Sequence, residues 1–369
     1  MTNISALMED PTQVPAAHRV AMLTRNDRLF HIILAQQFDA EMIERLCRLA
    51  EMIRNIADAK QGSQYLCTLL SHKRAMLYFI QPSTRTFLSF TAACQVLGMP
   101  YNEVRNPSTS SEVKGETEDD TVHVLSQYFD VIIMRHPEEG FAERMAYKLN
   151  KMPRPIPILN GGSGKDQHPT QAMLDIYTLA REFEPRLADR ARPMLSSNPF
   201  EGKTIAFVGD LKRGRTVRSL AYLLCRYSGV RLLFVSPPEL QMGDDIIEHL
   251  DRSGMTHETC DDLSRVISEC DAVYMTRLQD EWDSAGESKS IDLGKYRLTL
   301  EMADRFKDDL VIMHPLPRRE ELDVRLDTDP RAKYWDQVRN GMWMRAAMIA
   351  YVFNVDAEII DHYQSYYTF

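Results

Sequence analysis

The stretch Met76-Leu77-Tyr78-Phe79-Ile80-Gln81-Pro82-Ser83-Thr84-Arg85-Thr86-Phe87 decides how this chain folds. The leading apolar residues predict a buried strand, and Phe87 begins a stripe, continued by Phe90, Cys94 and Leu97, that is typical of an amphipathic helix. Pro82 suits a helix entry and Ser83 suits the N-cap. Because a helix N-terminus presents unpaired N–H groups and partial positive charge, the adjacent hydroxyls and guanidinium predict a phosphate site. In isolation, however, the motif is better explained as an ordinary cap with a surface arginine.

Further apolar runs alternate with helical patterns along most of the chain. Such alternation predicts an α/β protein in which parallel sheets are covered by helices on both faces. The candidate strands are Met76–Ile80, Val131–Met134, Ile156–Leu159, Thr204–Val208, Leu232–Ser236, Ala272–Thr276 and Leu310–His314.

These strands divide naturally into two sheets, so we expect two domains, at residues 1–169 and 170–339. A helix from Thr170 to about Phe183 is expected to pass between the sheets. A C-terminal helix within residues 340–369, beginning near Gly341, is expected to pack back on the first domain. The polar residues up to about 30 favour a flexible arm, Asp39 is expected to cap a helix, and residues 184–202 suit a linker or surface loop.

Composition narrows the range of functions. The chain has 369 residues and a net charge of −9, which argues against nucleic acid as the main partner. Its six cysteines form no CxxC motif and indicate reduced thiols, and His257 with Cys260 does not complete a metal set. No apolar run reaches the length of a membrane span, and no secretory or transit peptide is apparent, so we expect a cytoplasmic protein without membrane contact.

Polar and cationic residues follow most of the predicted strands. In parallel α/β folds, ligands bind beyond the carboxyl ends of the strands, so these residues are candidates for a binding site. They form six segments, which are Ser83–Thr86, Arg135–Pro137, Gln167–Gln171, Gly209–Thr216, Thr276–Gln279 and His314–Arg318.

Each segment also has a simpler explanation. Arg135 could be an ordinary salt-bridged arginine, His136 could be a cap, and His168 could merely begin a helix. Lys114 lies in a Ser-rich loop that is solvated by default, although a lysine on a mobile loop can also close a site over a charged substrate. Arg277 and Gln279 alternate on an extended segment and would suit bidentate binding of a carboxylate, but alone they would be an exposed strand end.

The segment Gly209-x4-Gly214-Arg215-Thr216 nearly matches a nucleotide-binding P-loop. The lysine of that motif is replaced by Arg215, and the loop interior holds bulky residues. We therefore favour Arg215 as a binder of carboxylate or phosphate at a helix start over a nucleotide triphosphatase.

Taken in order, these segments resemble the aspartate/ornithine carbamoyltransferase family from about residue 30 to the C-terminal helix. Each motif alone is weak, but the ordered set is highly specific. It comprises Ser83–Thr86, Lys114–Thr117, Met134–Pro137, His168–Gln171, Gly209–Leu211 with Gly214–Thr216, Met275–Gln279 and His314–Arg318. Pro315 and the Thr-Arg-x-Gln pattern at Thr276–Gln279 match the aspartate-type members, because ornithine-type members carry cysteine in place of the proline and lack that pattern.

The resemblance implies transfer of the carbamoyl group of carbamoyl phosphate to L-aspartate, in a homotrimer with active sites shared between subunits. Ser83, Thr84, Arg85 and Thr86 would hold the phosphate, while Thr86, Arg135 and His168 would contact the carbamoyl oxygen and Gln171 the amine. Ser110 and Lys114 would come from the adjacent subunit. Arg215, Arg277 and Gln279 would bind aspartate, and the carbonyls of Pro315 and Leu316 would orient the nitrogens. No metal or other cofactor is required, and a regulatory chain is compatible with this reading.

Three positions depart from the family pattern. Gln81 replaces a usual glutamate, Trp282 a usual arginine and Ser163 a usual aspartate. In the family, the usual glutamate and arginine at the first two positions would help to close the domains around substrates. Their replacement by Gln81 and Trp282 leaves two rival functions open. One is a carbamoyltransferase with another amine acceptor, and the other is a non-catalytic homologue that binds ligands or a partner.

Overall fold

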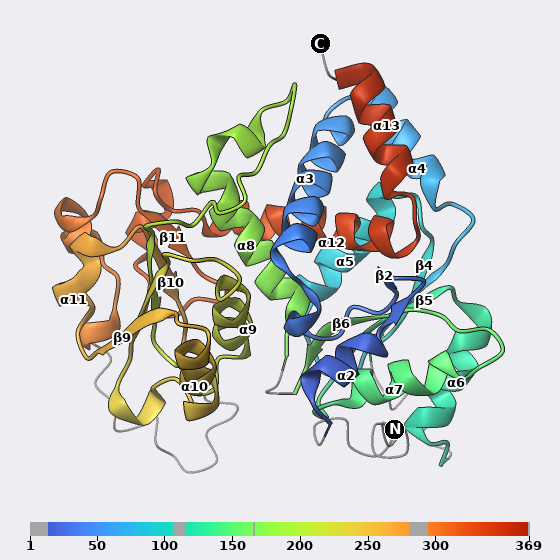
Figure 1. The fold of residues 1–369 in the computed structure, drawn as a ribbon, viewed down its shortest axis with the longest axis horizontal. Helices are drawn as coiled ribbons and strands as arrows, with labels where there is room; N and C mark the ends of the chain where they lie inside the picture. The colour runs from blue at the N-terminus through green and yellow to red at the C-terminus, as the bar shows by residue number, and fades with distance from the viewer. Residues whose placement is uncertain (1–13, 106–114, 165–166, 280–293, 368–369) are drawn as a thin grey trace. The chain divides into compact units, whose positions relative to one another are not determined.

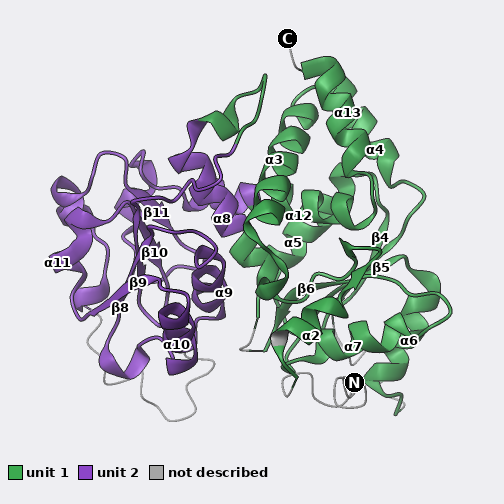
Figure 2. Cartoon of the chain, viewed as in Figure 1, with its two compact units in different colours: residues 1–173, 186–194, 341–369 green, residues 174–185, 195–340 purple. Residues whose placement is uncertain are grey.

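The computed structural model describes residues 14–105, 115–164, 167–279 and 294–367 (Figure 1). The chain divides into two compact units (Figure 2). Unit 1 takes the chain up to Met173, Arg186–Met194 and the part from Gly341, while unit 2 takes Leu174–Pro185 and Leu195–Asn340. Each unit contains one parallel sheet, which confirms the predicted two-domain α/β architecture.

Unit 1 is built on a four-stranded sheet in the order β4-β3-β5-β6, with every neighbouring pair parallel. Its strands are β3 (Ala75–Phe79), β4 (Tyr101–Val104), β5 (Val131–His136) and β6 (Ile158–Ser163). Its helices are α2 (Ala16–Ala21), α3 (Ala40–Ala57), α4 (Lys60–Leu69), α5 (Thr84–Val96), α6 (Glu118–Tyr128), α7 (Phe141–Asn150) and α13 (Asp356–Tyr367).

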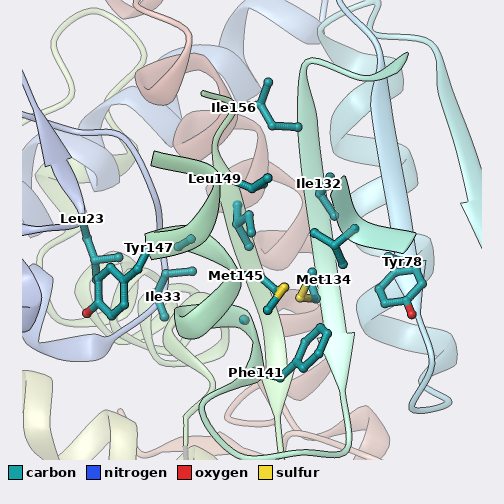
Figure 3. Close-up of a cluster of buried hydrophobic side chains, with 14 of the residues drawn as sticks. Leu23, Ile33, Tyr78, Ile132, Met134, Phe141, Met145, Tyr147, Leu149 and Ile156 are labelled. Atoms are coloured by element: carbon teal, nitrogen blue, oxygen red, sulfur yellow. The ribbon is translucent and has the colours of Figure 1, made fainter. Parts of the chain in front are cut away.

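One face of this sheet packs against α7. Figure 3 shows Ile132 and Met134 from β5 with Phe141 and Met145 from α7 in the same cluster. All four are buried, because residues that alternate along a strand share one face and meet an apolar stripe on the helix. Phe79 packs instead with Phe87 of α5, their ring centroids 5.5 Å apart.

Unit 2 is built on a five-stranded parallel sheet in the order β11-β10-β7-β8-β9. Its strands are β7 (Thr204–Val208), β8 (Arg231–Val235), β9 (Thr256–Cys260), β10 (Ala272–Met275) and β11 (Val311–Met313). The helices α9 (Arg215–Leu224) and α10 (Asp244–Arg252) lie on one side of it, and α11 (Leu263–Val266) lies on the other (Figure 1).

Two helices run from one unit into the other along the chain. Helix α8 (Pro169–Phe183) occupies the predicted span, and α12 (Tyr334–Val352) begins earlier than the predicted Gly341. Helix α13 then packs on α3, so the C-terminal helix contacts the first domain as predicted. Asp39 caps α3 by accepting a hydrogen bond from Met42 N at 2.8 Å, which confirms that prediction too.

The predicted flexible arm is wrong for residues 14–30. Helix α2 and the hairpin β1–β2 (Thr24–Arg25 and Arg28–Leu29) are formed there, and Leu23 is fully buried. Arg19 explains the attachment, since its guanidinium makes a bidentate ion pair at 2.8 and 2.5 Å with the buried carboxylate of Glu143. Residues 1–13 lie outside the described part of the chain.

Candidate functional site

The sheet of unit 1 has its switch point between β3 and β5. The chain leaves β3 toward β4 on one side and returns to β5 on the other, so the carboxyl ends of β3 and β5 flank the crevice where ligands bind in such sheets. Gln81 follows β3 and donates its N–H to the carbonyl of Arg135 in β5 at 3.2 Å. The two strand ends that carry the predicted residues are therefore tied together.

The N-terminus of α5 opens at this switch point. Ser83 occupies the N-cap with an extended backbone, yet its side chain makes no capping hydrogen bond. Thr84 and Arg85 are exposed in the first turn, and Thr86 is buried beneath them. Since the Ser83 hydroxyl does not serve the helix, the interpretation of this residue as a plain cap loses its support.

Thr86, Arg135 and His168 meet at the glycine pair Gly161–Gly162. Arg135 Nη1 donates to the carbonyl of Gly161 at 3.1 Å. A Cβ added at Gly162 would lie 2.5 Å from Arg135 Nη1 and 3.3 Å from His168 Cδ2, and one added at Gly161 would lie 3.6 Å from Thr86 Cγ2. All three side chains are more than nine-tenths buried. Three buried side chains that carry hydrogen-bond donors, from α5, β5 and the start of α8, thus lie around the same two glycines, where the dielectric constant is low.

The last residues of β6 hold this place open. Gly162 has a φ of +114°, which favours glycine, and its N–H donates to Asn160 Oδ1 at 2.8 Å. Ser163, the departure from the family pattern, accepts a hydrogen bond from Asn160 Nδ2 at 3.3 Å. Gln171 lies three residues beyond His168, with its N–H bonded to the His168 carbonyl at 3.0 Å, so both belong to the first turn of α8.

His136 supports the fold instead of the site. Its Nδ1 accepts the N–H of Glu138 at 3.2 Å, its Nε2 lies 3.0 Å from Glu118 Oε1, and its ring stacks on Phe141. His136, Glu118 and Glu138 are close enough together to hold a metal ion. Both ring nitrogens are already engaged in hydrogen bonds, however, so the arrangement does not fit a ligand set.

The sheet of unit 2 has its own switch point, between β7 and β10. Gly209 directly follows β7 and has a φ of +110°, and a Cβ there would lie 2.2 Å from the carbonyl oxygen of Thr276, which directly follows β10. Only a glycine allows the two strand ends to approach this closely. Arg215 follows as the first residue of α9, and Arg277 and Gln279 follow β10, all three of them partly buried.

Asp210 is a functional candidate that the sequence analysis missed. It is fully buried, and its two oxygens accept the N–H groups of Gln279 and Arg213, each at 3.1 Å. Burial raises the pKa of this carboxyl, although the two N–H groups and the Arg213 guanidinium oppose the shift. Asp210 thereby fixes the backbone that presents Arg277 and Gln279. Its place after a strand was a signal, but an acidic residue did not fit a site for anions.

The P-loop alternative does not fit this geometry. A phosphate cradle needs free backbone N–H groups, but those of Leu211 and Lys212 donate to the Leu240 carbonyl at 3.0 and 2.9 Å. The N–H of Arg213 is bonded to Asp210. The turn is filled by a carboxylate from the chain itself, which would repel a phosphate.

Pro315 and Leu316 lie beyond the carboxyl end of β11, and both are half-buried. The N–H of Leu316 donates to His314 Nδ1 at 2.7 Å. Three residues named in the sequence analysis, Ser110, Lys114 and Trp282, lie outside the described residues.

Two parallel sheets that each place cationic and polar side chains at a switch point define a two-domain α/β protein with a candidate anion site in each domain. The chain belongs to the aspartate/ornithine carbamoyltransferase family, since residues 31–181 match the carbamoyl-P binding domain of that family and residues 201–352 match its Asp/Orn binding domain.

Individual relatives agree with this assignment. The chain is 40% identical over 326 residues to aspartate carbamoyltransferase 1, chloroplastic, of Pisum sativum, covering 87% of this chain and 78% of that one. It is 38% identical to the aspartate carbamoyltransferase catalytic subunit of Chromobacterium violaceum, covering 88% and 98%. The aspartate transcarbamoylase of Trypanosoma cruzi, solved with carbamoyl aspartate and phosphate, superposes with a TM-score of 0.73 at 34% identity, covering 89% and 96%.

None of the described helices is both long and apolar enough to cross a lipid bilayer.

Proposed function

We propose that this chain transfers the carbamoyl group of carbamoyl phosphate to the α-amine of L-aspartate, which yields N-carbamoyl-L-aspartate and phosphate. The grouping of the buried Thr86, Arg135 and His168 side chains around Gly161–Gly162 carries the proposal, because three residues able to donate hydrogen bonds in one buried place suit an oxyanion. The names of the relatives point to the same reaction, and aspartate transcarbamoylase structures of Trypanosoma cruzi contain carbamoyl phosphate and aspartate.

In this proposal the phosphate is held by the N-terminus of α5. Ser83, Thr84 and Thr86 supply hydroxyls and Arg85 supplies a guanidinium beside the helix dipole. The carboxylates of aspartate are assigned to Arg215, Arg277 and Gln279, whose planar groups suit bidentate binding. Both substrates are anions, so clustered cations are needed to hold them together in a chain of net charge −9.

The proposed reaction is a direct attack of the amine on the carbonyl carbon. As the C–N bond forms, negative charge develops on the carbonyl oxygen, where Thr86, Arg135 and His168 are assigned as donors. Gln171 and the carbonyls of Pro315 and Leu316 are assigned to the two nitrogens. The C–O bond to phosphate then breaks, the amine loses a proton and phosphate leaves. Positioning of the two substrates supplies much of the rate enhancement.

We also propose a homotrimer in which Ser110 and Lys114 act in the active site of the neighbouring subunit. The exposed apolar side chains of Leu88, Val124 and Tyr128 on α5 and α6 support a covered face on unit 1. A regulatory chain is compatible with this assembly, and the cytoplasmic location stays a prediction.

An assay of the purified protein for carbamoyl aspartate, with ornithine as the alternative acceptor, tests the reaction. We expect product from aspartate alone. Changing Arg85 to Ala should nearly abolish the use of carbamoyl phosphate, whereas Arg252→Ala, an exposed arginine at the end of α10, is the control and should leave it unchanged. If folded wild-type protein yields no carbamoyl aspartate, the proposal is wrong, and product from another amine would identify a different acceptor.

A further inference from the structure

A buried histidine directly precedes Pro315 and Leu316 in unit 2, and we call the loop that these two residues form the acceptor loop. His314 directly follows β11 and is 1% exposed. Its Nδ1 lies 2.7 Å from the N–H of Leu316 and its Nε2 lies 2.8 Å from Glu321 Oε1. A backbone N–H can only donate and an ionised carboxylate can only accept. The hydrogen-bond pattern therefore assigns a neutral ring whose proton is on Nε2.

This tautomer supports an unfavourable backbone conformation. Leu316 has a φ of +55°, in the left-handed region that costs a non-glycine residue roughly 1 kcal/mol. The bond from its N–H to Nδ1 spans two residues and closes the loop on itself. An imidazole that carried its proton on Nδ1 could not accept this bond, and the loop would lose the contact that offsets the conformational cost.

The histidine is itself anchored by a chain of buried polar groups. The backbone N–H of His314 donates to Gln337 Oε1 at 2.9 Å, and Gln337 Nε2 donates to Asp175 Oδ1 at 2.7 Å. The hydroxyl of Tyr274 donates to the other oxygen of Asp175 at 2.8 Å. All four residues are at most 1% exposed, so the loop is fixed to α12, α8 and β10.

Glu321, which accepts the hydrogen bond from His314 Nε2, is held in its charged form. Burial alone would raise the pKa of Glu321, but the hydrogen bond from His314 and those from backbone N–H groups, including that of Arg319, outweigh it and lower the pKa. An ionised Glu321 keeps the ring proton on Nε2, which leaves Nδ1 free to accept.

We propose that His314 is a positioning residue that, through Nδ1, holds Leu316 in the conformation that aims the carbonyls of Pro315 and Leu316 at the acceptor's nitrogen. This inference rests on the proposed function of those two carbonyls. It assigns the histidine to binding of the acceptor and leaves the phosphate site of unit 1 unaffected.

A pair of substitutions separates the two ring nitrogens. In His314→Asn the amide oxygen can replace Nδ1, and in His314→Gln the longer amide can replace Nε2 only. Calorimetry with N-(phosphonacetyl)-L-aspartate, a ligand of a Trypanosoma cruzi relative that carries an amide nitrogen between its phosphonate and its aspartate, measures the effect without turnover. We expect affinity to fall on the order of 10–100-fold in His314→Gln and by less than about 3-fold in His314→Asn. The KM for carbamoyl phosphate should change in neither.

The matched controls are His257→Asn and His257→Gln, since His257 also contacts a carboxylate, that of Asp251 at 2.9 Å, but lies on β9 away from the loop. They should leave binding unchanged. Equal losses in both His314 variants, or no loss in either, would refute the role of Nδ1.

A second measurement uses the wild-type protein and does not depend on whether the variants fold. Nitrogen NMR of histidine-labelled wild-type protein, with the ring signals of His314 assigned through bonds from its own backbone, should show a protonated Nε2 and an unprotonated Nδ1. The opposite tautomer, or an imidazolium at neutral pH, would overturn the inference. If the wild-type protein makes no carbamoyl aspartate, the proposed function fails, while this tautomer still stands or falls by itself.

Discussion

At the scale of single residues, the site depends on the absence of one side chain. Gly162 lets Arg135 and His168 approach each other, since a Cβ would stand 2.5 Å from Arg135 Nη1. The residue that matters most for the geometry of the predicted oxyanion site is thus one that supplies no functional group.

We expect Gly162→Ala to lower kcat/KM by about 100-fold, because displacement of a catalytic group by about 1 Å costs that much. Stability should fall by about 1–2 kcal/mol from the positive φ. The control is Gly202→Ala, which has a φ of +72° but places its Cβ more than 4 Å from every described heavy atom beyond its chain neighbours. Steady-state kinetics and thermal unfolding of both variants check this. A similar loss of activity in the control would show that backbone strain alone is responsible.

Asp210 and His314 show where prediction from the sequence ends at this scale. The cationic residues were found because their charge matches the anions they are expected to bind. Asp210 acts on the site through hydrogen bonds from the backbone N–H groups of Gln279 and Arg213, and the position of His314 depends on Gln337 and Asp175, which are distant in sequence. Contacts of that kind exist only once the chain has folded.

At the scale of elements, the sequence predicted buried strands well and exposed ones badly. The seven predicted strands exist, although β6 begins later and extends further than expected. Strands β4 and β9 were missed, since both lie at a sheet edge and are largely exposed. An edge strand is paired on one side only, so its residues do not need the apolar composition that identifies a central strand.

The edge of the first sheet beside β6 is protected by an extended segment and a buried histidine. Ile32 pairs with β6 through Ile158 O at 2.9 Å, and His31 accepts the N–H of Ile158 with Nδ1 at 2.9 Å. Burial lowers the pKa of His31 to about 4, although the hydrogen bond with Asn150 opposes the shift. The segment is therefore attached through a ring that must stay neutral.

This attachment predicts a pH-dependent stability. The unfolded chain binds a proton on His31 below about pH 6.5 and the folded protein only near pH 4, so stability is lost as pH falls between these values. The expected loss is about 3 kcal/mol from the 1.36 kcal/mol per pKa unit. Urea unfolding between pH 7 and 4 measures it. His31→Asn, which keeps an acceptor for Ile158, should flatten the profile, and His257→Asn should not. An unchanged slope in His31→Asn would assign the effect to other groups.

The N-terminal helix α2 is attached by one ion pair of the kind that is costly to break. Changing Arg19 to Ala leaves the buried carboxylate of Glu143 without its guanidinium, and we expect a loss of about 3 kcal/mol. Arg25→Ala is the control, because Arg25 is exposed and rests on Phe30. Chemical unfolding of both variants gives the comparison. A loss below 1 kcal/mol in Arg19→Ala would show that the apolar contacts of Leu23 hold the arm.

At the scale of the whole molecule, the proposed trimer makes a prediction that a monomer cannot meet. If Lys114 acts in the neighbouring active site, Lys114→Ala and Arg135→Ala chains are each inactive alone. Unfolding and refolding them together forms mixed trimers in which some sites contain both native residues, so part of the activity should return.

The control is a mixture of Thr86→Ala with Arg135→Ala. These two residues lie in one site of one chain, but in a mixed trimer each site still lacks one of them, so no activity should return. Light scattering should give three times the chain mass of 42.5 kDa. Failure of the first mixture to regain activity, with trimers present, would place Lys114 outside the shared site.

The division into units has a consequence for protein synthesis. Unit 2 ends at Asn340, whereas unit 1 is completed only by the residues from Gly341 onward, where Asp356 accepts ion pairs from Arg28 and Arg45. A ribosome makes the chain from the N-terminus, so all residues of unit 2 have been synthesised before the last residues of unit 1. The helices and strands made earliest, with the phosphate-binding motif among them, must wait for the last residues to be translated before their core can close.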